Sequence, residues 1–288
     1  MKVGVMTQFG GDMTAPEYVA RMGRGLEERG FHSVWAPDHL LVPKVIESSY
    51  PYTPDGSFPV EPTTQGLEPF TLLSFLAAHT TRLRLGTGVI VLPQRNAALT
   101  AKQAADVDVL SGGRLDFGIG VGWMADEFAA LGMSFERRGA RTDDYIRMMQ
   151  SLWGTHESSY DGEFVKLPPA YQYPKPIQKP HPPFYFGGES TFALRRVARF
   201  GHWFGVDVMP EAVPAKLVLL KEQCDREGRD VKDVKIALCP YANPCDRDTL
   251  RRYEDAGIDQ VIMAAFVFGQ EALEATIDDL AERLIVPG

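Results

Sequence analysis

The stretch RLRLGTGVIVLPQRNAALTAKQAADVDVLSGGRLDFGIG, residues 82–120, has the pattern of a strand, a helix and a second strand in direct succession. Residues 82–92 and 114–120 are short apolar runs, and residues 98–113 between them have the spacing of a helix. A strand joined through a helix to the next strand is the repeating unit of a parallel sheet. This stretch therefore predicts an α/β fold.

The same alternation continues on both sides of this stretch. Eight strands are expected, at residues 2–9, 31–37, 82–92, 114–120, 183–188, 202–207, 234–242 and 259–266. Helical patterns follow them, for example at residues 16–30, 69–80, 191–201 and 271–284. Eight such units predict a closed (β/α)8 TIM barrel, although pattern alone leaves an open doubly wound sheet as the alternative. With 288 residues the chain has the size of one barrel, and we expect a single domain over residues 1–288.

Two long insertions interrupt the alternation. Residues 41–69 follow the second strand, and residues 154–183 precede the fifth strand and contain the hairpin-like SYDGEFVKL. Loops of this length in a compact domain are usually functional or disordered. Because the sites of barrel enzymes lie at the carboxyl ends of the strands, we expect both insertions to frame the mouth there.

Composition and charge exclude some classes of partner. The net charge is −8 and the two signs are mixed along the chain, which argues against nucleic acid and anionic membranes as partners. The start of the chain lacks the apolar core of a signal peptide, and we expect a cytoplasmic protein. Cys224, Cys239 and Cys245 have no CxxC spacing, and the first strand has no histidine pair, so we expect buried thiols and no metal site.

Glycines stand at the ends of several expected strands. Gly86 and Gly88 interrupt an apolar strand, where glycine usually marks a bulge or the close approach of another group. The segment FGIGVGW, residues 117–123, ends the fourth strand with three glycines, which suit either a close ligand or a tight turn. As a dinucleotide fingerprint it is weak, because Trp123 takes the place of the third glycine.

Two further segments carry polar groups at strand ends. GGEST, residues 187–191, precedes a helix and is either an anion site at the helix amino end or a plain N-cap. Asp38 and His39 follow the second strand, and a histidine beside a carboxylate there is either an acid-base group or an ordinary surface histidine.

In their order and spacing these segments resemble the bacterial luciferase-like superfamily, and within it the branch that uses the deazaflavin coenzyme F420. The resemblance covers nearly the whole chain, and LSGGRLDFGIGVGWMADEF, residues 110–128, is its most specific part. It implies a (β/α)8 barrel and an enzyme that transfers hydride between coenzyme F420 and a small organic substrate. An FMN-dependent monooxygenase is the alternative, and a binding protein without catalysis is a third reading. The resemblance does not name the substrate.

The resemblance also implies roles for particular residues. A non-proline cis peptide at Gly88–Val89 would support the ring of the cofactor. Two loops would contact its ribityl chain and phosphate, namely Gly120, Val121, Gly122 and Trp123, and Gly187, Gly188, Glu189 and Ser190. His39 would be the acid-base residue and Asp38 its companion. The related dehydrogenases have a proton-donating glutamate at the position of Trp123, so an aromatic wall is expected there instead.

The anionic tail of the cofactor would need cations at the mouth. The candidates are Arg95, Arg137, Arg138, Arg141, Lys175 and Lys179, although a solvated charged surface is the commoner explanation of each. We expect a homodimer whose partners are otherwise small molecules.

Overall fold

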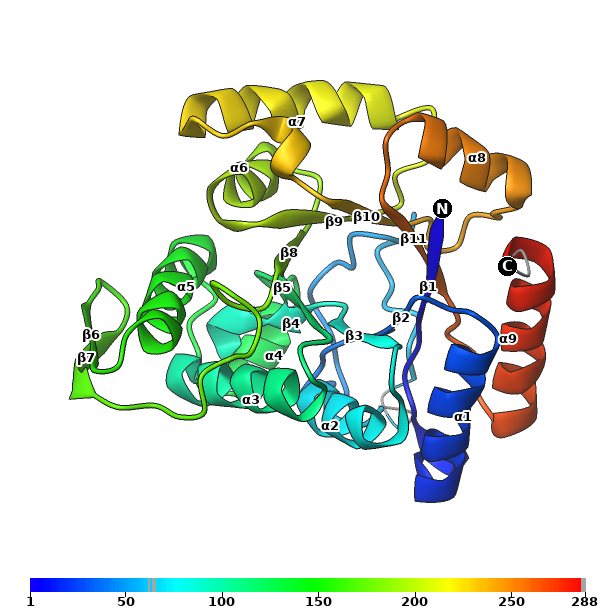
Figure 1. The fold of residues 1–288 in the computed structure, drawn as a ribbon, viewed down its shortest axis with the longest axis horizontal. Coiled ribbons are helices and arrows are strands. Elements are labelled where there is room, and N and C mark those ends of the chain that lie inside the picture. Colours follow the sequence, from blue (N-terminus) through cyan, green and yellow to red (C-terminus); the bar gives the residue numbers. More distant parts are fainter. Residues whose placement is uncertain (62, 64–65, 286–288) are drawn as a thin grey trace.

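The computed structural model describes residues 1–61, 63 and 66–285, and its centre is a closed parallel barrel (Figure 1). The strands are β1 (Lys2–Met6), β2 (Ser33–Ala36), β3 (Arg84–Thr87) with its continuation β4 (Ile90–Val91), β5 (Leu115–Gly120), β8 (Phe184–Gly187), β9 (His202–Val206), β10 (Ile236–Cys239) and β11 (Gln260–Ala264). β1 pairs with both β2 and β11, and β5 pairs with both β3 and β8, so the sheet closes on itself. The predicted barrel is confirmed, and the open sheet is wrong.

Helices surround the barrel between its strands. They are α1 (Pro16–Glu28), α2 (Pro69–His79), α3 (Ala97–Leu110), α5 (Arg138–Gly154), α6 (Thr191–Phe200), α7 (Val213–Glu227), α8 (Arg247–Asp255) and α9 (Gln270–Leu284), with a short α4 (Ala125–Ala130) at one end. Local sequence explains their limits. Pro16 and Pro69 occupy first turns, where a missing N–H costs nothing, and Gly30 has φ +85° just beyond α1.

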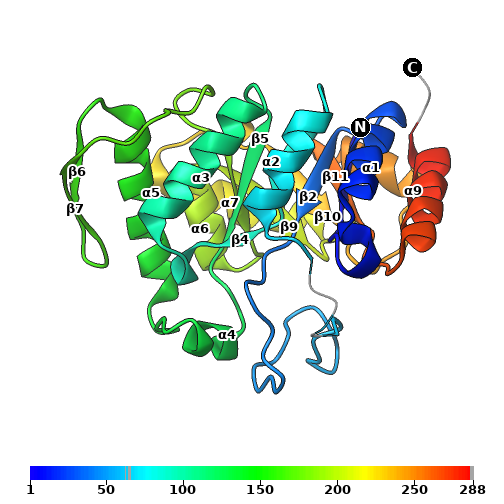
Figure 2. The ribbon, with the colours of Figure 1, turned by 90° about the horizontal axis from the view of Figure 1, so that it is seen from below.

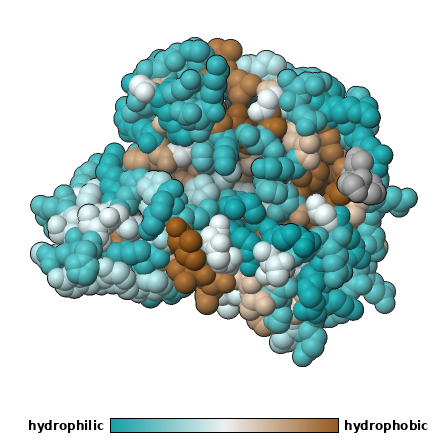
Figure 3. All heavy atoms as spheres, in the orientation of Figure 1, coloured by the Kyte–Doolittle hydropathy of each residue, from teal (hydrophilic) through white to brown (hydrophobic). Residues whose placement is uncertain are grey.

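Two apolar cores hold these layers together. One lies between the strands and the helices, and the other lies inside the barrel around Trp35, Tyr185, Phe204 and Ile262. The inner core explains why β3 has a glycine at position 86, because a Cβ at Gly86 would overlap the indole of Trp35. On the face drawn in Figure 3, hydrophilic residues cover the periphery and hydrophobic ones occupy limited areas. Among the described residues, no helix is long and apolar enough to cross a membrane.

The third strand is interrupted between β3 and β4, as the glycine pattern predicts. The Gly88–Val89 peptide bond is cis, which confirms that expectation. The interruption is held from both sides. The Gly88 N–H donates to the Ala36 carbonyl at 2.7 Å, and the Thr87 hydroxyl donates to the Gly118 carbonyl at 2.7 Å. These two hydrogen bonds hold the break between β3 and β4 in place at the carboxyl end of the strand.

The two insertions lie differently on the barrel. Figure 2 shows the segment after β2 and helix α4 projecting from the same side. The second insertion forms the expected hairpin, β6 (Ser158–Asp161) with β7 (Lys166–Ala170), whose turn pairs with Arg137 of the cavity lining through Glu163. It then reaches the start of β5, where Gln178 donates to the Leu115 carbonyl at 2.7 Å. The expectation that residues 154–183 frame the mouth therefore holds for the hairpin turn and is wrong for the segment that leads into β8. A segment that leads into a parallel strand arrives at its amino end, which is the end away from the mouth.

A partly buried carboxylate on α1 anchors the entry into β3. Glu27 accepts hydrogen bonds from the backbone N–H groups of Thr81, Arg82 and Leu83, at 2.8, 3.0 and 3.1 Å. Burial by itself raises the pKa of Glu27, but these bonds and one from the Thr81 hydroxyl outweigh it and lower the pKa to about 2. The carboxylate is therefore more stable in the folded chain than in the unfolded one.

We expect Glu27→Gln to lower the free energy of unfolding at pH 7 by about 2 kcal/mol, because hydrogen bonds to a charged acceptor are lost. The folded-state pKa lies below the ordinary value of 4.5, so this contribution is complete above pH 4.5 and is lost as the pH falls toward 2. Urea denaturation of both proteins at pH 7, 4 and 3 measures it. A difference between the two proteins that stays constant over this range contradicts the assignment.

Candidate active site

A cavity of about 1010 Å³ occupies the carboxyl end of the barrel. Each position around the barrel contributes to it, through Met6, His39, Val89, Val121, Gly188, Val206, Tyr241 and Ala264. Most residues that the sequence analysis selected lie along it, namely Asp38, His39, Gly88, Val89, Gly120, Val121, Gly122, Trp123, Gly187, Gly188 and Ser190. Glu189 is not among the lining residues.

The floor of the cavity is apolar, and its glycines leave space for the side chain of Val89. Val89 fills the space between the ends of β5 and β8, because a Cβ at Gly120 would lie 2.6 Å from its methyl group and one at Gly187 would lie 3.3 Å away. Met6 and Phe204 continue this surface inside the barrel. Such a floor can support a planar ring.

The Glu189 side chain lies outside the cavity lining and holds the end of β9. Its carboxylate accepts a hydrogen bond from the Val206 N–H at 2.6 Å, while Lys216 donates to its carbonyl at 3.2 Å. Burial raises the pKa of Glu189, and the Val206 bond and the charge of Lys216 oppose that rise. The side chain therefore shapes the loop after β8, and only the backbone of Glu189 is left to contact a ligand.

Positive charge gathers where α5 and α6 begin. Arg137, Arg138 and Arg196 line the cavity beside the glycines that follow β5 and β8. Arg137 pairs with Glu163, and Arg196 pairs with Asp143 at 2.5 Å and donates to the Gly139 carbonyl at 3.1 Å. Arg138 donates to the Gly122 carbonyl at 2.9 Å, so among the described residues it is the arginine of the three whose charge is left for a ligand. The Ser190 hydroxyl accepts the Ala193 N–H at 3.2 Å, which confirms the N-cap of α6. The other N–H groups of this first turn add partial positive charge there. These groups together form a site suited to an anion.

Four of the six expected cations lie elsewhere. Arg95 pairs with Asp38, Arg141 donates to the Pro93 and Ser134 carbonyls, and Lys175 and Lys179 donate to backbone carbonyls of the second insertion and α5. The sequence analysis missed Arg196, because it lies within an amphipathic helical pattern that resembles any solvated helix.

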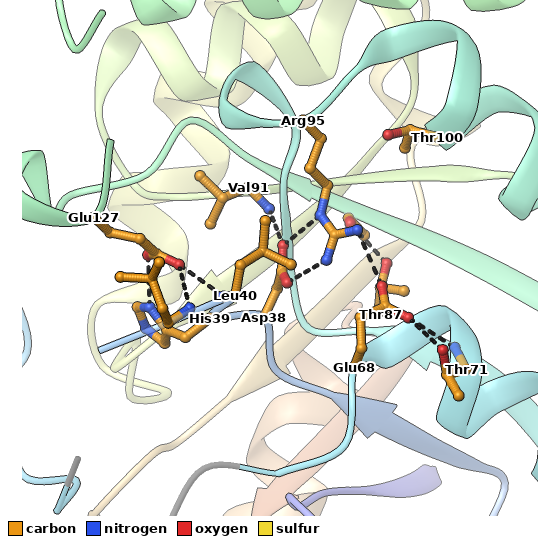
Figure 4. A network of polar contacts seen from close by, with 12 residues as sticks. Asp38, His39, Leu40, Glu68, Thr71, Thr87, Val91, Arg95, Thr100 and Glu127 are labelled. Atoms are coloured by element: carbon orange, nitrogen blue, oxygen red, sulfur yellow. Dashed lines mark hydrogen bonds and ion pairs between the residues drawn. The ribbon is translucent and has the colours of Figure 1, made fainter. Parts of the chain in front are cut away.

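The Asp38 side chain is completely buried and holds the end of the third strand in place. Its carboxylate accepts from Arg95 Nε at 3.0 Å, from Arg95 Nη2 at 2.5 Å and from the Val91 N–H at 2.9 Å (Figure 4). Arg95 in turn lies 3.0 Å from a carboxylate oxygen of Glu68. These contacts fix β4 against the end of β2, and none of them reaches His39.

His39 has a different carboxylate partner. Its Nδ1 lies 2.9 Å from Oε2 of Glu127, whose other oxygen accepts the Leu40 N–H at 2.7 Å (Figure 4). Glu127 is buried, whereas the His39 side chain is 21% exposed toward the cavity. Because a carboxylate accepts hydrogen bonds, Nδ1 carries the proton, and Nε2 is the nitrogen left to exchange one with a ligand.

Glu127 is a site residue that sequence reasoning missed. It lies inside the quoted segment of residues 110–128, but it is separated from His39 by 88 positions, and no local spacing relates the two. The neighbouring Asp126 has a similar role, since it accepts the Ser48 N–H at 3.1 Å. The Ser48 hydroxyl accepts the Ala125 N–H at 2.9 Å, so α4 ties the insertion after β2 to the mouth.

Rings from this insertion and from the strand ends form one wall, which we call the aromatic cluster: Tyr50, Tyr52, Phe58, Trp123 and Tyr241. The Tyr50 and Trp123 ring centres are 4.9 Å apart, and the Tyr50 and Tyr241 hydroxyls are 2.9 Å apart. The Phe58 ring lies 5.1 Å from His39. Burial raises the pKa of both bonded tyrosines, so their hydroxyls stay neutral. Trp123 thus belongs to an aromatic wall, as expected.

Comparisons with known proteins agree over nearly the whole chain. The family described as luciferase-like monooxygenase matches residues 1–283. Uncharacterized protein Rv0953c of Mycobacterium tuberculosis is 30% identical over 266 residues, which are 92% of this chain and 93% of the relative. The FMNH2-dependent dimethylsulfone monooxygenase of Pseudomonas putida is 31% identical over 171 residues, which are 57% of this chain and 46% of that enzyme.

Solved structures share the architecture at lower identity. Monooxygenase RslO1 of Streptomyces bottropensis superimposes with a TM-score of 0.75 at 20% identity, covering 99% of both chains. An F420-dependent secondary alcohol dehydrogenase, solved with an F420-acetone adduct, also gives 0.75, at 17% identity and 98% coverage of both. At these identities the likeness establishes the fold.

Proposed function

Since this chain belongs to the luciferase-like monooxygenase family, we propose that it transfers hydride between coenzyme F420 and a small organic substrate bound at the barrel mouth. The observation that carries the proposal is the His39–Glu127 pair, which faces a cavity with an apolar floor and a cationic end. The F420-dependent alcohol dehydrogenase with the same fold supports the choice of cofactor.

The cavity fits such a cofactor from ring to tail. Gly88 and Val89 would lie against the ring, where the floor is apolar. The loops Gly120–Trp123 and Gly187–Ser190 would contact the ribityl chain and the phosphate, with Arg138 and the amino end of α6 supplying positive charge. The unpaired donors of helix amino ends and the guanidinium group are the usual ligands of phosphate in proteins.

Deazaflavins exchange a hydride with a substrate, whereas reduced flavins also react with oxygen. The part assigned to this chain is the proton that accompanies the hydride. Nε2 of His39 would give it to the substrate oxygen or take it away, while Glu127 holds Nδ1 and stabilises the charged imidazolium. Asp38, which the sequence analysis selected as companion, would act only by positioning β4. The aromatic cluster excludes water from this side of the mouth.

An FMN-dependent monooxygenase is the second candidate. The dimethylsulfone monooxygenase of Pseudomonas putida favours it, because this relative uses FMNH2 and is 31% identical over its matched region. The same floor and anion site would accept FMN, because FMN has a planar ring and a phosphate as coenzyme F420 does. The cofactor therefore decides between the two reactions.

A titration with both cofactors tests the proposal. Purified protein is titrated with coenzyme F420 and with FMN, in oxidised and reduced forms, while the absorbance and fluorescence of the cofactor are recorded. We expect micromolar or tighter binding of coenzyme F420 and at least tenfold weaker binding of FMN. Micromolar binding of FMN without measurable binding of F420 would assign the protein to the monooxygenases.

Arg138→Gln is expected to weaken cofactor binding about tenfold at low salt, because a charge-assisted hydrogen bond to the anionic tail contributes about 1.5 kcal/mol or more. The loss should shrink at high salt, where exposed charges are screened. Arg251→Gln, at an exposed arginine of α8, is the matched control and should leave affinity unchanged. Equal affinity of the Arg138 variant and the original protein at low salt would place the tail elsewhere.

A further inference from the structure

The cavity has two parts of different chemistry. Arg137, Arg138 and Arg196 lie beside the loops after β5 and β8, which are neighbours in the barrel. The other part lies under the insertion after β2 and contains the aromatic cluster and Phe266. Its rings come from that insertion, from the loop after β5 and from the ends of β10 and β11. Charge is therefore concentrated at one end of the cavity, and aromatic rings at the other.

The acid and the histidine that border the aromatic part already have partners. Among its described lining residues these are Asp38, which pairs with Arg95, and His39, whose Nδ1 lies 2.9 Å from Glu127. The polar groups that remain include the hydroxyls of Tyr50 and Tyr241, which bond to each other at 2.9 Å. The two hydroxyls keep one hydrogen-bond donor and free lone pairs as acceptors, and both groups are neutral.

We infer that the aromatic part binds the substrate and selects an uncharged aromatic or fused-ring compound, an inference that rests on the proposed function. A carboxylate or phosphate placed there would lose its hydration without gaining a cation, which is unfavourable by several kcal/mol. A planar ring would bury its faces against Tyr50, Phe58 and Trp123 in the edge and offset arrangements that aromatic groups prefer.

The cavity has room for both molecules. Its volume of about 1010 Å³ is at the upper end of the range for sites that hold one drug-sized ligand. Its arginines stand in or beside α5 and α6, whereas the aromatic cluster comes mainly from the insertion after β2, and the two meet where Arg138 donates to the Gly122 carbonyl. His39 lies beside the aromatic cluster, because its ring is 5.1 Å from Phe58 and 6.0 Å from Trp123, and it also lines the cavity. A substrate on the aromatic side would thus reach His39 without displacing the cofactor.

The test compares two probes with the same ring system, 2-naphthaldehyde and 2-naphthoate, by calorimetric titration of the full chain with and without saturating cofactor. We expect the neutral probe to bind at least tenfold more tightly than the carboxylate. Phe58→Ala should weaken the neutral probe at least tenfold. Phe192→Ala, which removes an 80% exposed ring beside the arginines, is the matched control and should change its affinity less than twofold.

The outcomes separate this inference from the proposed function. Tighter binding of naphthoate, an unchanged affinity in Phe58→Ala, or competition between the neutral probe and the cofactor would each overturn the inference. Binding of the neutral probe as expected, together with no binding of either cofactor, would uphold the substrate class and refute the proposed reaction. Cofactor binding without binding of the neutral probe would do the reverse. Circular dichroism of both variants confirms that they are folded.

Discussion

Replacing His39 by alanine is expected to lower turnover by about 10²–10⁴-fold, which is what a positioned general acid or base usually contributes. The side chain faces the cavity, and Glu127 orients it through Nδ1 at 2.9 Å. Cofactor affinity should stay within a few-fold, because the anion site beside α5 and α6 supplies most of the anchoring. Steady-state rates and a cofactor titration on the same preparation measure both quantities.

His79→Asn is the matched control, since His79 lies in the last turn of α2, away from the mouth. It should change neither quantity. A purely structural role for His39 gives a different result: stability and cofactor affinity fall together, and the rate per bound cofactor hardly changes. Full turnover of His39→Ala at saturating cofactor and substrate would assign the proton transfer to water or to another residue.

Asp38→Ala is expected to lower the free energy of unfolding by about 3–5 kcal/mol, because it leaves the guanidinium of Arg95 buried with only Glu68 as a partner. Arg95 is 8% exposed, so water cannot replace the lost carboxylate. The Val91 N–H also loses its acceptor. The melting temperature should fall by roughly 5–8 °C, and urea denaturation at pH 7 measures the free energy directly.

Asp106→Ala removes a half-exposed carboxylate that pairs with Lys102 one turn away on α3, and is expected to change stability by less than about 0.5 kcal/mol. The comparison isolates the effect of burial. If Asp38→Ala is as stable as the original protein and yet loses turnover without losing cofactor affinity, Asp38 takes part in proton transfer as the sequence analysis predicts.

Local sequence was sufficient for the order of strands and helices. Residues 82–120 alternate between apolar runs and helical spacing, and backbone preference acts over a few residues, so each element can be read from its own segment. The glycines at strand ends could be located in the same way, as could the interruption at Gly88. These glycines mark places where the chain leaves a regular strand, and such places are encoded by the local sequence.

The choice between an open sheet and a closed barrel needed more than periodicity. Closure depends on β1 pairing with β11, two strands that are more than 250 residues apart, and the resemblance of the quoted segments to a known family predicted it correctly. Position in the chain misled for the segment before β8, because a segment that leads into a parallel strand arrives at its amino end, and only the hairpin turn reaches the mouth, through Glu163 and Arg137.

Adjacent positions suggested that Asp38 is the companion of His39, yet the structure turns the two side chains to different partners. Asp38 bonds to Arg95, and His39 bonds to Glu127, a carboxylate 88 positions away. Sequence by itself determined which segments carry chemistry, since strand ends and glycines are encoded locally. Tertiary structure alone decided which charges meet, because barrel closure brings loops from separate strands to one mouth, and burial there leaves a charge stable only beside its partner.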